Sequence, residues 1–154
     1  MKINIETVDN LKEDEIIIRC GGLTKTIQKI YRMISDEVSL DPKLVYYKEN
    51  EEYYFPLQDV LFFETSGDYV YAHTAVDAFR IKFRLYELEE MLPGNFVRAA
   101  KSTIINIGHI LSISRNIASS SLVQFHNSHK KVYVSRLYYQ NLKQKLSERR
   151  NYED

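Results

Sequence analysis

The sequence has one cysteine, no tryptophan, five glycines and three prolines among its 154 residues, and these shortages exclude several classes of protein. The single cysteine, Cys20, cannot form an internal disulfide and suits a reducing compartment. No glycine falls in a G-x-G-x-x-G or Walker spacing, which argues against a nucleotide enzyme. No apolar run approaches the roughly 18–20 residues that cross a bilayer. The first residues, MKINIETVDNLKEDE, lack the apolar stretch of a signal peptide. We therefore expect a cytoplasmic protein.

Patterns for catalysis and metal binding are missing as well. There is no G-x-S-x-G turn, and the adjacent Glu89 and Glu90 do not face one another on a helix, so they are no acid–base pair. Neither a Cys-rich nor an HExxH spacing accompanies the four histidines, which fall in separate expected elements: His73, His109, His126 and His129. We expect no enzyme, no metal site, no cofactor and no small-molecule substrate.

What the chain does have is aromatic and β-branched residues. Twelve tyrosines and seven phenylalanines, with many isoleucines and valines, favour β structure. At 44% apolar and 27% charged residues, the chain has enough apolar surface for one core plus a small appendage. From residue 42 on, short alternating strands follow one another between turns, which is typical of packed antiparallel sheets.

The expected strands of this region end in recognisable turns. LVYYKENEEYYFP predicts two strands joined by a polar turn, and Ser66-Gly67-Asp68 separates DVLFFET from YVYAHT. The strand FRIKF precedes a short helix, LYELEEML, that Pro93-Gly94 closes. Four further strands and a final amphipathic helix are predicted in NFVRAAKSTIINI, HILSISR, SLVQFH, KKVYVS and RLYYQNLKQKL. We expect a β domain over residues 42–148, with a frayed tail over residues 149–154.

A different pattern precedes this domain. KINIETV and EIIIRC predict two strands, and apolar residues from Leu23 to Val38 then recur at helical spacing behind Thr24, a suitable N-cap. Residues 1–41 are therefore predicted to form a small, acidic ββα extension.

Charge is strongly segregated although the net charge is zero. Residues 95–150 carry ten lysines and arginines against Glu148 alone, a net charge of +9, whereas residues 1–55 and 56–94 are both acidic. Such a region indicates a surface for a polyanion, with a merely solvated basic face as the alternative.

Polar residues also stand where strands end. In RAAKSTIINIGHI, Lys101 and Ser102 directly precede a buried-strand pattern, and Arg136 follows VYVS. Tyr69 follows the turn between two apolar strands. Cations that project from strand ends reach phosphates or guanine edges, and tyrosine can donate to a phosphate.

In combination these segments resemble the LytTR DNA-binding domain of bacterial transcription regulators. The resemblance covers residues 56–147 and rests on FPLQDVLFFETSGDYVYAH, on L-P-x-N-F-x-R-x-x-K-S-x-I-I-N, and on V-S-R some thirty residues later. It implies a mainly β fold of small antiparallel sheets packed side by side with short helices. It also implies a sequence-specific regulator that reads adjacent major grooves of promoter DNA through loops at sheet ends.

The resemblance implies roles for individual residues. Lys101, Ser102 and Arg136 match positions at which the family contacts DNA, and Tyr69 lies at or one residue from the family's first contact position. Ala100 departs from the family, which commonly has histidine there, so this chain lacks one donor that the family can offer to DNA. Arg98 could contact a phosphate or form an ion pair with the preceding helix. Including Arg98, the candidates for phosphate contacts are Arg98, Lys130, Lys131, Tyr138 and Lys143.

The partners implied are double-stranded promoter DNA, a second copy of the chain, and a small inhibitory membrane protein of the kind paired with stand-alone regulators of this type. The extension has no room for the receiver domain of a response regulator and would serve dimerisation or partner docking. On the residues alone two alternatives stay open: a single-stranded nucleic-acid-binding protein, because tyrosines near lysines suit base stacking, and a protein-interaction module with a basic face.

Overall fold

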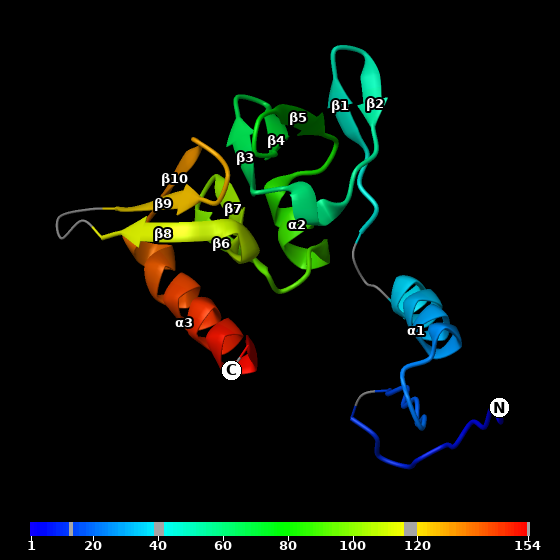
Figure 1. Cartoon of the computed structure of the whole chain (residues 1–154). Helices are drawn as coiled ribbons and strands as arrows, with labels where there is room; N and C mark the ends of the chain where they lie inside the picture. Colours follow the sequence, from blue (N-terminus) through cyan, green and yellow to red (C-terminus); the bar gives the residue numbers. More distant parts are fainter. Residues whose placement is uncertain (13, 39–41, 116–119, 154) are drawn as a thin grey trace. The chain divides into compact units, whose positions relative to one another are not determined.

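The computed structural model of the chain describes residues 1–12, 14–38, 42–115 and 120–153 (Figure 1). The chain divides into two units, Met1–Ser39 and Leu40–Asp154. Of the described elements, one helix belongs to the first unit, and all strands and the remaining helices belong to the second.

The first unit contains one helix and no sheet in its described residues. Helix α1 spans Lys25–Val38, and the Thr24 hydroxyl accepts a hydrogen bond from the Ile27 amide at 3.3 Å, as expected of an N-cap. Residues 1–12 and 14–24 form no strand, so the predicted ββα extension is wrong in its two strands. A lone two-stranded hairpin is marginal in water, and here Ile3 and Ile5 are 88% and 94% exposed, so no apolar face holds one together.

The second unit is built on a seven-stranded antiparallel sheet in the order β2-β1-β5-β4-β3-β7-β6. Some neighbours in the sheet are far apart in the sequence, such as β1 with β5 and β3 with β7. The bounds of the seven strands are β1 Tyr46–Lys48, β2 Glu51–Tyr53, β3 Phe62–Ser66, β4 Tyr69–His73, β5 Ala78–Ile81, β6 Phe96–Ala100 and β7 Thr103–Asn106.

Two tight turns of this sheet depend on positive φ angles. Glu49 and Asn50 join β1 to β2 with φ values of 51° and 65°, and Gly67 begins the β3–β4 turn at φ 61°. Two-residue hairpins favour such turns because their twist matches that of the strands. The turns predicted at KENEE and Ser66-Gly67-Asp68 are therefore confirmed.

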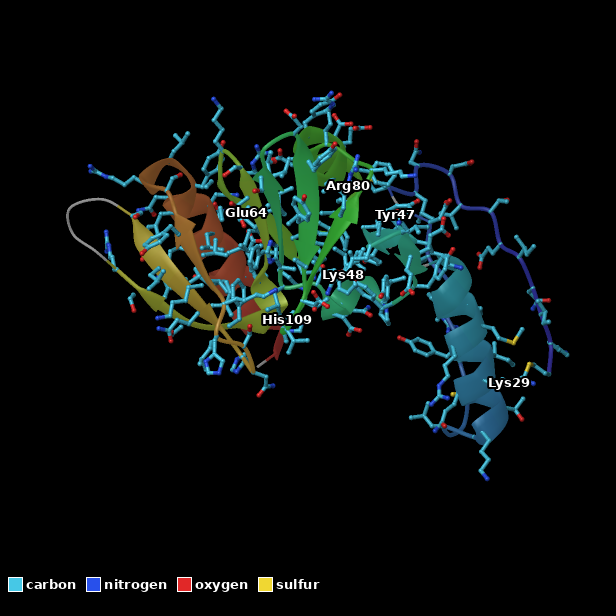
Figure 2. All side chains as sticks on the ribbon, turned by 90° about the horizontal axis from the view of Figure 1, so that it is seen from above. Lys29, Tyr47, Lys48, Glu64, Arg80 and His109 are labelled. Carbon is cyan, nitrogen blue, oxygen red and sulfur yellow. The ribbon has the colours of Figure 1, made fainter. Side chains whose placement is uncertain are left out.

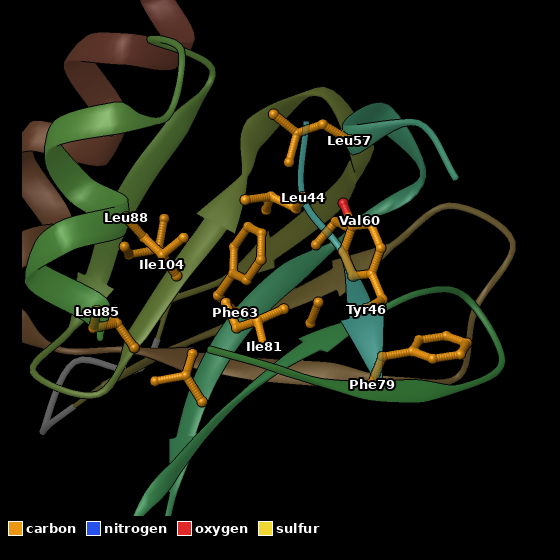
Figure 3. Packing of buried hydrophobic residues seen from close by; sticks show 12 residues of the cluster. Leu44, Tyr46, Leu57, Val60, Phe63, Phe79, Ile81, Leu85, Leu88 and Ile104 are labelled. Atoms are coloured by element: carbon orange, nitrogen blue, oxygen red, sulfur yellow. The ribbon is translucent and has the colours of Figure 1, made fainter. Parts of the chain in front are cut away.

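One face of the sheet is covered by helix α2, Leu85–Met91. Phe63, Ile81 and Ile104 of the sheet and Leu85 and Leu88 of α2 belong to one buried cluster (Figure 3). The short 3₁₀ helix η1, Leu57–Asp59, contributes its buried leucine to the same cluster.

The other face of β3, β7 and β6 is covered by a second sheet. Phe62 points away from its neighbour Phe63 and stacks on Phe125 of the second sheet, with ring centroids 5.5 Å apart. Helix α3 completes this second cluster with the fully buried Leu142. The elements involved are η2 Ile107–His109, β8 Ile110–Ser114, β9 Ser121–Phe125, β10 Lys131–Val134 and α3 Arg136–Glu153, and the second sheet has the order β10-β9-β8.

The expected fold class, small antiparallel sheets side by side with short helices, is confirmed. The last helix is longer than predicted, because it continues through Glu153 where a frayed tail over residues 149–154 was expected. No proline or glycine occurs between Arg136 and Glu153 to end the helix.

Candidate nucleic-acid interface

Three chain segments that carry the predicted DNA contacts meet at one end of the β scaffold. The β3–β4 turn lies beside the β6–β7 turn, because the Thr65 amide donates to the Ser102 carbonyl at 2.9 Å. The β10–α3 junction lies beside β6, because the Ser135 amide donates to the Ala99 carbonyl at 2.9 Å. Tyr69, Lys101 and Arg136, which lie far apart in the sequence, therefore belong to neighbouring segments.

Lys101 and Ser102 form the two-residue turn between β6 and β7, and both are exposed. The pairing of the two strands shifts between Arg98 and Ala100, which makes Ala99 part of a β-bulge. A bulge bends its strand and thereby redirects the residues next to it. All four residues of β7, Thr103–Asn106, are buried, so the isoleucines hold the hairpin in the core and Lys101 projects beyond it.

The largely buried Arg98 side chain donates hydrogen bonds to carbonyl groups at this turn. Its Nε donates to the Ala100 carbonyl at 2.8 Å, its Nη2 donates to the Lys101 carbonyl, and its Nη1 lies 2.8 Å from a carboxylate oxygen of Glu89 on α2. The Arg98 side chain is only 16% exposed. The ion pair with the preceding helix, one of the two roles predicted for Arg98, is confirmed.

Tyr69, the first residue of β4, is paired with a cation. The guanidinium carbon of Arg80 lies 3.6 Å from the centre of the Tyr69 ring, and the tyrosine remains 44% exposed. One face of the ring is therefore covered, and the phenol and the guanidinium together form the exposed group at this position. Asp68 in the adjoining turn adds an acidic side chain to the same end.

Arg136 is the exposed first residue of α3. Lys143 follows seven residues later and is exposed, so the two lie on similar sides of the helix, about 10 Å apart along its axis. Tyr138 is half-buried. Tyr139 packs into the second core cluster, with the Arg115 guanidinium 5.2 Å from the centre of its ring.

Lys130 and Lys131 lie at the other end of the second sheet. Lys131 pairs with Gln124 at the start of β10, whereas Val134, next to the junction with α3, ends the strand. The Lys130 ammonium contacts His73 Nδ1 at 3.2 Å and the Asp77 carbonyl, and burial lowers its pKa. The structure thus does not bring Lys130 to the end that holds Lys101 and Arg136.

Some cations at the end that holds the two turns and the β10–α3 junction were not among the residues predicted from the sequence. Arg80, Lys82 and Arg84 are exposed, and Arg115 follows β8 at the end where β10 meets α3. A signal existed for the first two: in FRIKF the apolar residues alternate with cations, which places Arg80 and Lys82 on one exposed face.

His73 is half-buried and packs against an aromatic ring. His73 stacks on Phe62 with ring centroids 4.2 Å apart, and its Nε2 lies 3.5 Å from a Glu64 carboxylate oxygen. Burial, followed by the nearby charge of Lys130, lowers the pKa of His73 to about 4. Among the described residues no three His, Cys, Asp or Glu side chains come together as a metal site.

The sequence is similar to a known domain family and to known regulators. The family of the LytTr DNA-binding domain matches residues 50–147. An uncharacterized HTH-type transcriptional regulator of Staphylococcus aureus strain NCTC 8325 / PS 47 is 31% identical over 147 residues, which cover 96% of this chain and 99% of that protein. A regulator of the same description from strain COL has the same values.

A solved structure is similar as well. The LytTr DNA-binding domain of a Bacillus cereus protein described as a putative methyl-accepting/DNA response regulator matches with a TM-score of 0.62 and 26% identity, over 68% of this chain and 97% of that one. The description "HTH-type" of the two regulators refers to a helix-turn-helix. In the described residues of this chain no such pair of helices occurs, because strands separate α1, α2 and α3. None of the described helices has the length and apolar composition of a membrane span.

Proposed function

This chain belongs to the LytTR family of DNA-binding transcription regulators, and we propose that it reads adjacent major grooves of promoter DNA through the turns at one end of its β scaffold. The observation that supports the proposal most is the hydrogen-bonded succession of the β3–β4 turn, the β6–β7 turn and the β10–α3 junction. One duplex can meet all three at once because they share one end.

Recognition on this proposal divides into two parts. Arg136 and Lys101 contact base edges, where arginine suits the two acceptors of guanine in the major groove. Tyr69 contributes its phenol, and Ser102 its hydroxyl, to the adjoining backbone. Lys143 and the other exposed cations of residues 95–150 attract phosphates whatever the sequence, which supplies affinity and makes binding salt-dependent.

Helix α3 acts mainly as a support. Tyr139, Leu142 and Leu146 pack into the second cluster, so one side of the helix is committed to the scaffold. Its first residue, Arg136, stands at the junction with β10 and carries the contact. This differs from a recognition helix that lies in the groove.

We further propose that this chain is a non-enzymatic regulator that acts in the cytoplasm, where promoter DNA is found. It binds as a dimer or as two copies on repeated sites. Among residues 1–12 and 14–34 none is buried, so this part of the first unit lacks a core of its own. Helix α1 then serves to dimerise the chain or to dock a small inhibitory membrane protein. Deleting residues 1–40 should change the oligomeric state, DNA binding or capture of that partner; if all three stay unchanged, this role is refuted.

The experiment for the main proposal is a gel-shift competition at several salt concentrations. A labelled duplex that the wild-type chain has selected from a random pool is challenged with unlabelled random duplex and with single strands. We expect the selected duplex to be displaced poorly by both, and its affinity to fall steeply with salt. Equal competition by single strands would favour the single-strand binder, and no affinity for any DNA at low salt would favour the protein-interaction module.

A further inference from the structure

One face of the large sheet carries aromatic and cationic side chains that neither buried cluster uses. Tyr47 of β1, Arg80 of β5 and Tyr71 of β4 are direct cross-strand partners and therefore project from the same face. Figure 2 shows Tyr47 and Arg80 on these neighbouring strands, with Glu64 of β3 farther along the same sheet. The second cluster, which covers this face at β3, β7 and β6, contains no residue of β1, β4 or β5.

The two cations of this face are held by tyrosine rings. The Arg80 guanidinium lies 3.6 Å from the Tyr69 ring centre, and the Lys82 ammonium lies 4.4 Å from the Tyr47 ring centre. A cation over a ring face is attracted by the quadrupole of the ring. Each cation is therefore restrained on the surface before any ligand arrives.

Neither cation has an acidic partner in the part of the chain that the structure describes: no carboxylate oxygen lies within 4.0 Å of Arg80 or Lys82. Lys48, on the same strand as Tyr47, provides the contrast. Its ammonium lies 2.6 Å from an Asp77 carboxylate oxygen, and that pairing raises the pKa of Lys48. The charges of Arg80 and Lys82 thus remain available to an anion from outside.

The position of the two cations connects them to the proposed interface. Ile81 pairs with Val70, so the end of β5 lies beside the start of β4, and Lys82 follows directly next to the β3–β4 turn. Arg80 lies on the same face, two residues farther along β5. The two cations therefore extend the proposed interface from the β3–β4 turn across β5 toward β1.

We propose that Arg80 and Lys82 bind two backbone phosphates of the duplex outside the bases that are read, so that bound DNA continues over the face formed by β4, β5 and β1. This inference rests on the proposed function. Arg80 presents a planar fork that matches a phosphate with two parallel hydrogen bonds, and the Tyr69 phenol donates alongside it. Lys82 contributes a point charge. Tyr69 is then a positioning residue for Arg80 as well as a contact.

The test uses the full chain and the duplex that the wild type selects from a random pool. In the double variant Arg80→Gln/Lys82→Gln, the slope of log K against log salt should be shallower by about 1.8, since each phosphate contact contributes about 0.9. Hydroxyl-radical protection should shorten on one flank, and the base preference should stay the same. Lys48→Gln is the charge control: Lys48 is on the neighbouring strand, but its ammonium lies over the Phe79 ring on the other face and is paired with Asp77, so slope and protection should stay unchanged.

A second pair of variants tests the role of the tyrosine ring. Tyr69→Phe keeps a ring beneath Arg80 and should keep most of the flanking protection, whereas Tyr69→Leu should lose it although no charge is removed. Thermal unfolding checks that each variant is folded. Unchanged slope and protection in the folded double variant would overturn the inference while the proposed function stands. A wild-type chain that binds no duplex at all would overturn both.

Discussion

The role of Arg98 leads to a prediction in which two explanations give opposite results. In a structural role, its guanidinium donates to three acceptors at once: the carbonyls of Ala100 and Lys101 and the carboxylate of Glu89. As a phosphate contact, only its charge would matter. Replacing Arg98 with lysine keeps the charge but removes the planar fork, so the variant Arg98→Lys separates the two roles.

The expected size of the effect comes from the contacts. Hydrogen bonds to a charged group contribute about 1.5–3 kcal/mol each, and the Arg98 side chain is only 16% exposed. A lysine ammonium lacks the planar fork that serves both carbonyls, and if one of these bonds is lost we expect Arg98→Lys to lower the free energy of unfolding by about 1–3 kcal/mol. The turn that carries Lys101 then loses a restraint, and affinity for the selected duplex should fall roughly tenfold, which corresponds to about 1.4 kcal/mol.

Urea unfolding and gel shifts measure the two effects. Glu89→Gln is the control, because it leaves both carbonyl bonds in place and removes an ion pair whose carboxylate is 53% exposed; it should cost less than about 1 kcal/mol and leave DNA affinity unchanged. If Arg98→Lys binds the duplex as tightly as the wild type and is equally stable, the structural role of Arg98 is refuted.

Three further predictions concern single residues. Arg136→Ala should cost about 1–3 kcal/mol in binding and relax discrimination at one base position, measured with a set of singly substituted duplexes; a uniform loss over all of them would contradict base contact. Lys143→Ala should weaken all duplexes equally and reduce the salt slope by about 0.9, so a loss confined to one duplex would count against it. His73 has a pKa of about 4 in the folded chain and about 6.5 when unfolded, so the unfolded chain binds an extra proton between these values and stability should fall by up to roughly 3 kcal/mol as pH drops from 6.5 to 4. In His73→Gln this dependence should flatten, and an unchanged pH profile of the urea midpoint would refute the assignment.

Most of the β domain can be predicted from local patterns in the sequence. Alternation in YVYAH and FRIKF places Val70 and Ile81 in the core and Tyr69 and Arg80 outside, because successive side chains of a strand point to opposite faces. The turns at Gly67 and at Asn50 could also be predicted, since these residues tolerate positive φ.

What could not be predicted depends on contacts between distant segments. That Arg80 would cover Tyr69 depends on the pairing of β4 with β5, and that Arg98 would hold the Lys101 turn depends on a bulge at Ala99. Short turns fix the register within a hairpin, but the sequence does not say which strands pair across longer connections. The sequence also did not show that the Lys130 ammonium contacts His73 and the Asp77 carbonyl. The two N-terminal strands failed for the opposite reason: their pattern was suitable, but no third strand or apolar face among the described residues supports them.

The central claim is that turns at one end of a β scaffold, and not an inserted helix, read the DNA. Selection of bound duplexes from a random pool by the wild type, by Lys101→Ala and by Arg136→Ala tests it most directly. The account predicts one motif for the wild type and a loss of preference at different positions of that motif in the two variants. Two variants that select the wild-type motif without change would contradict it.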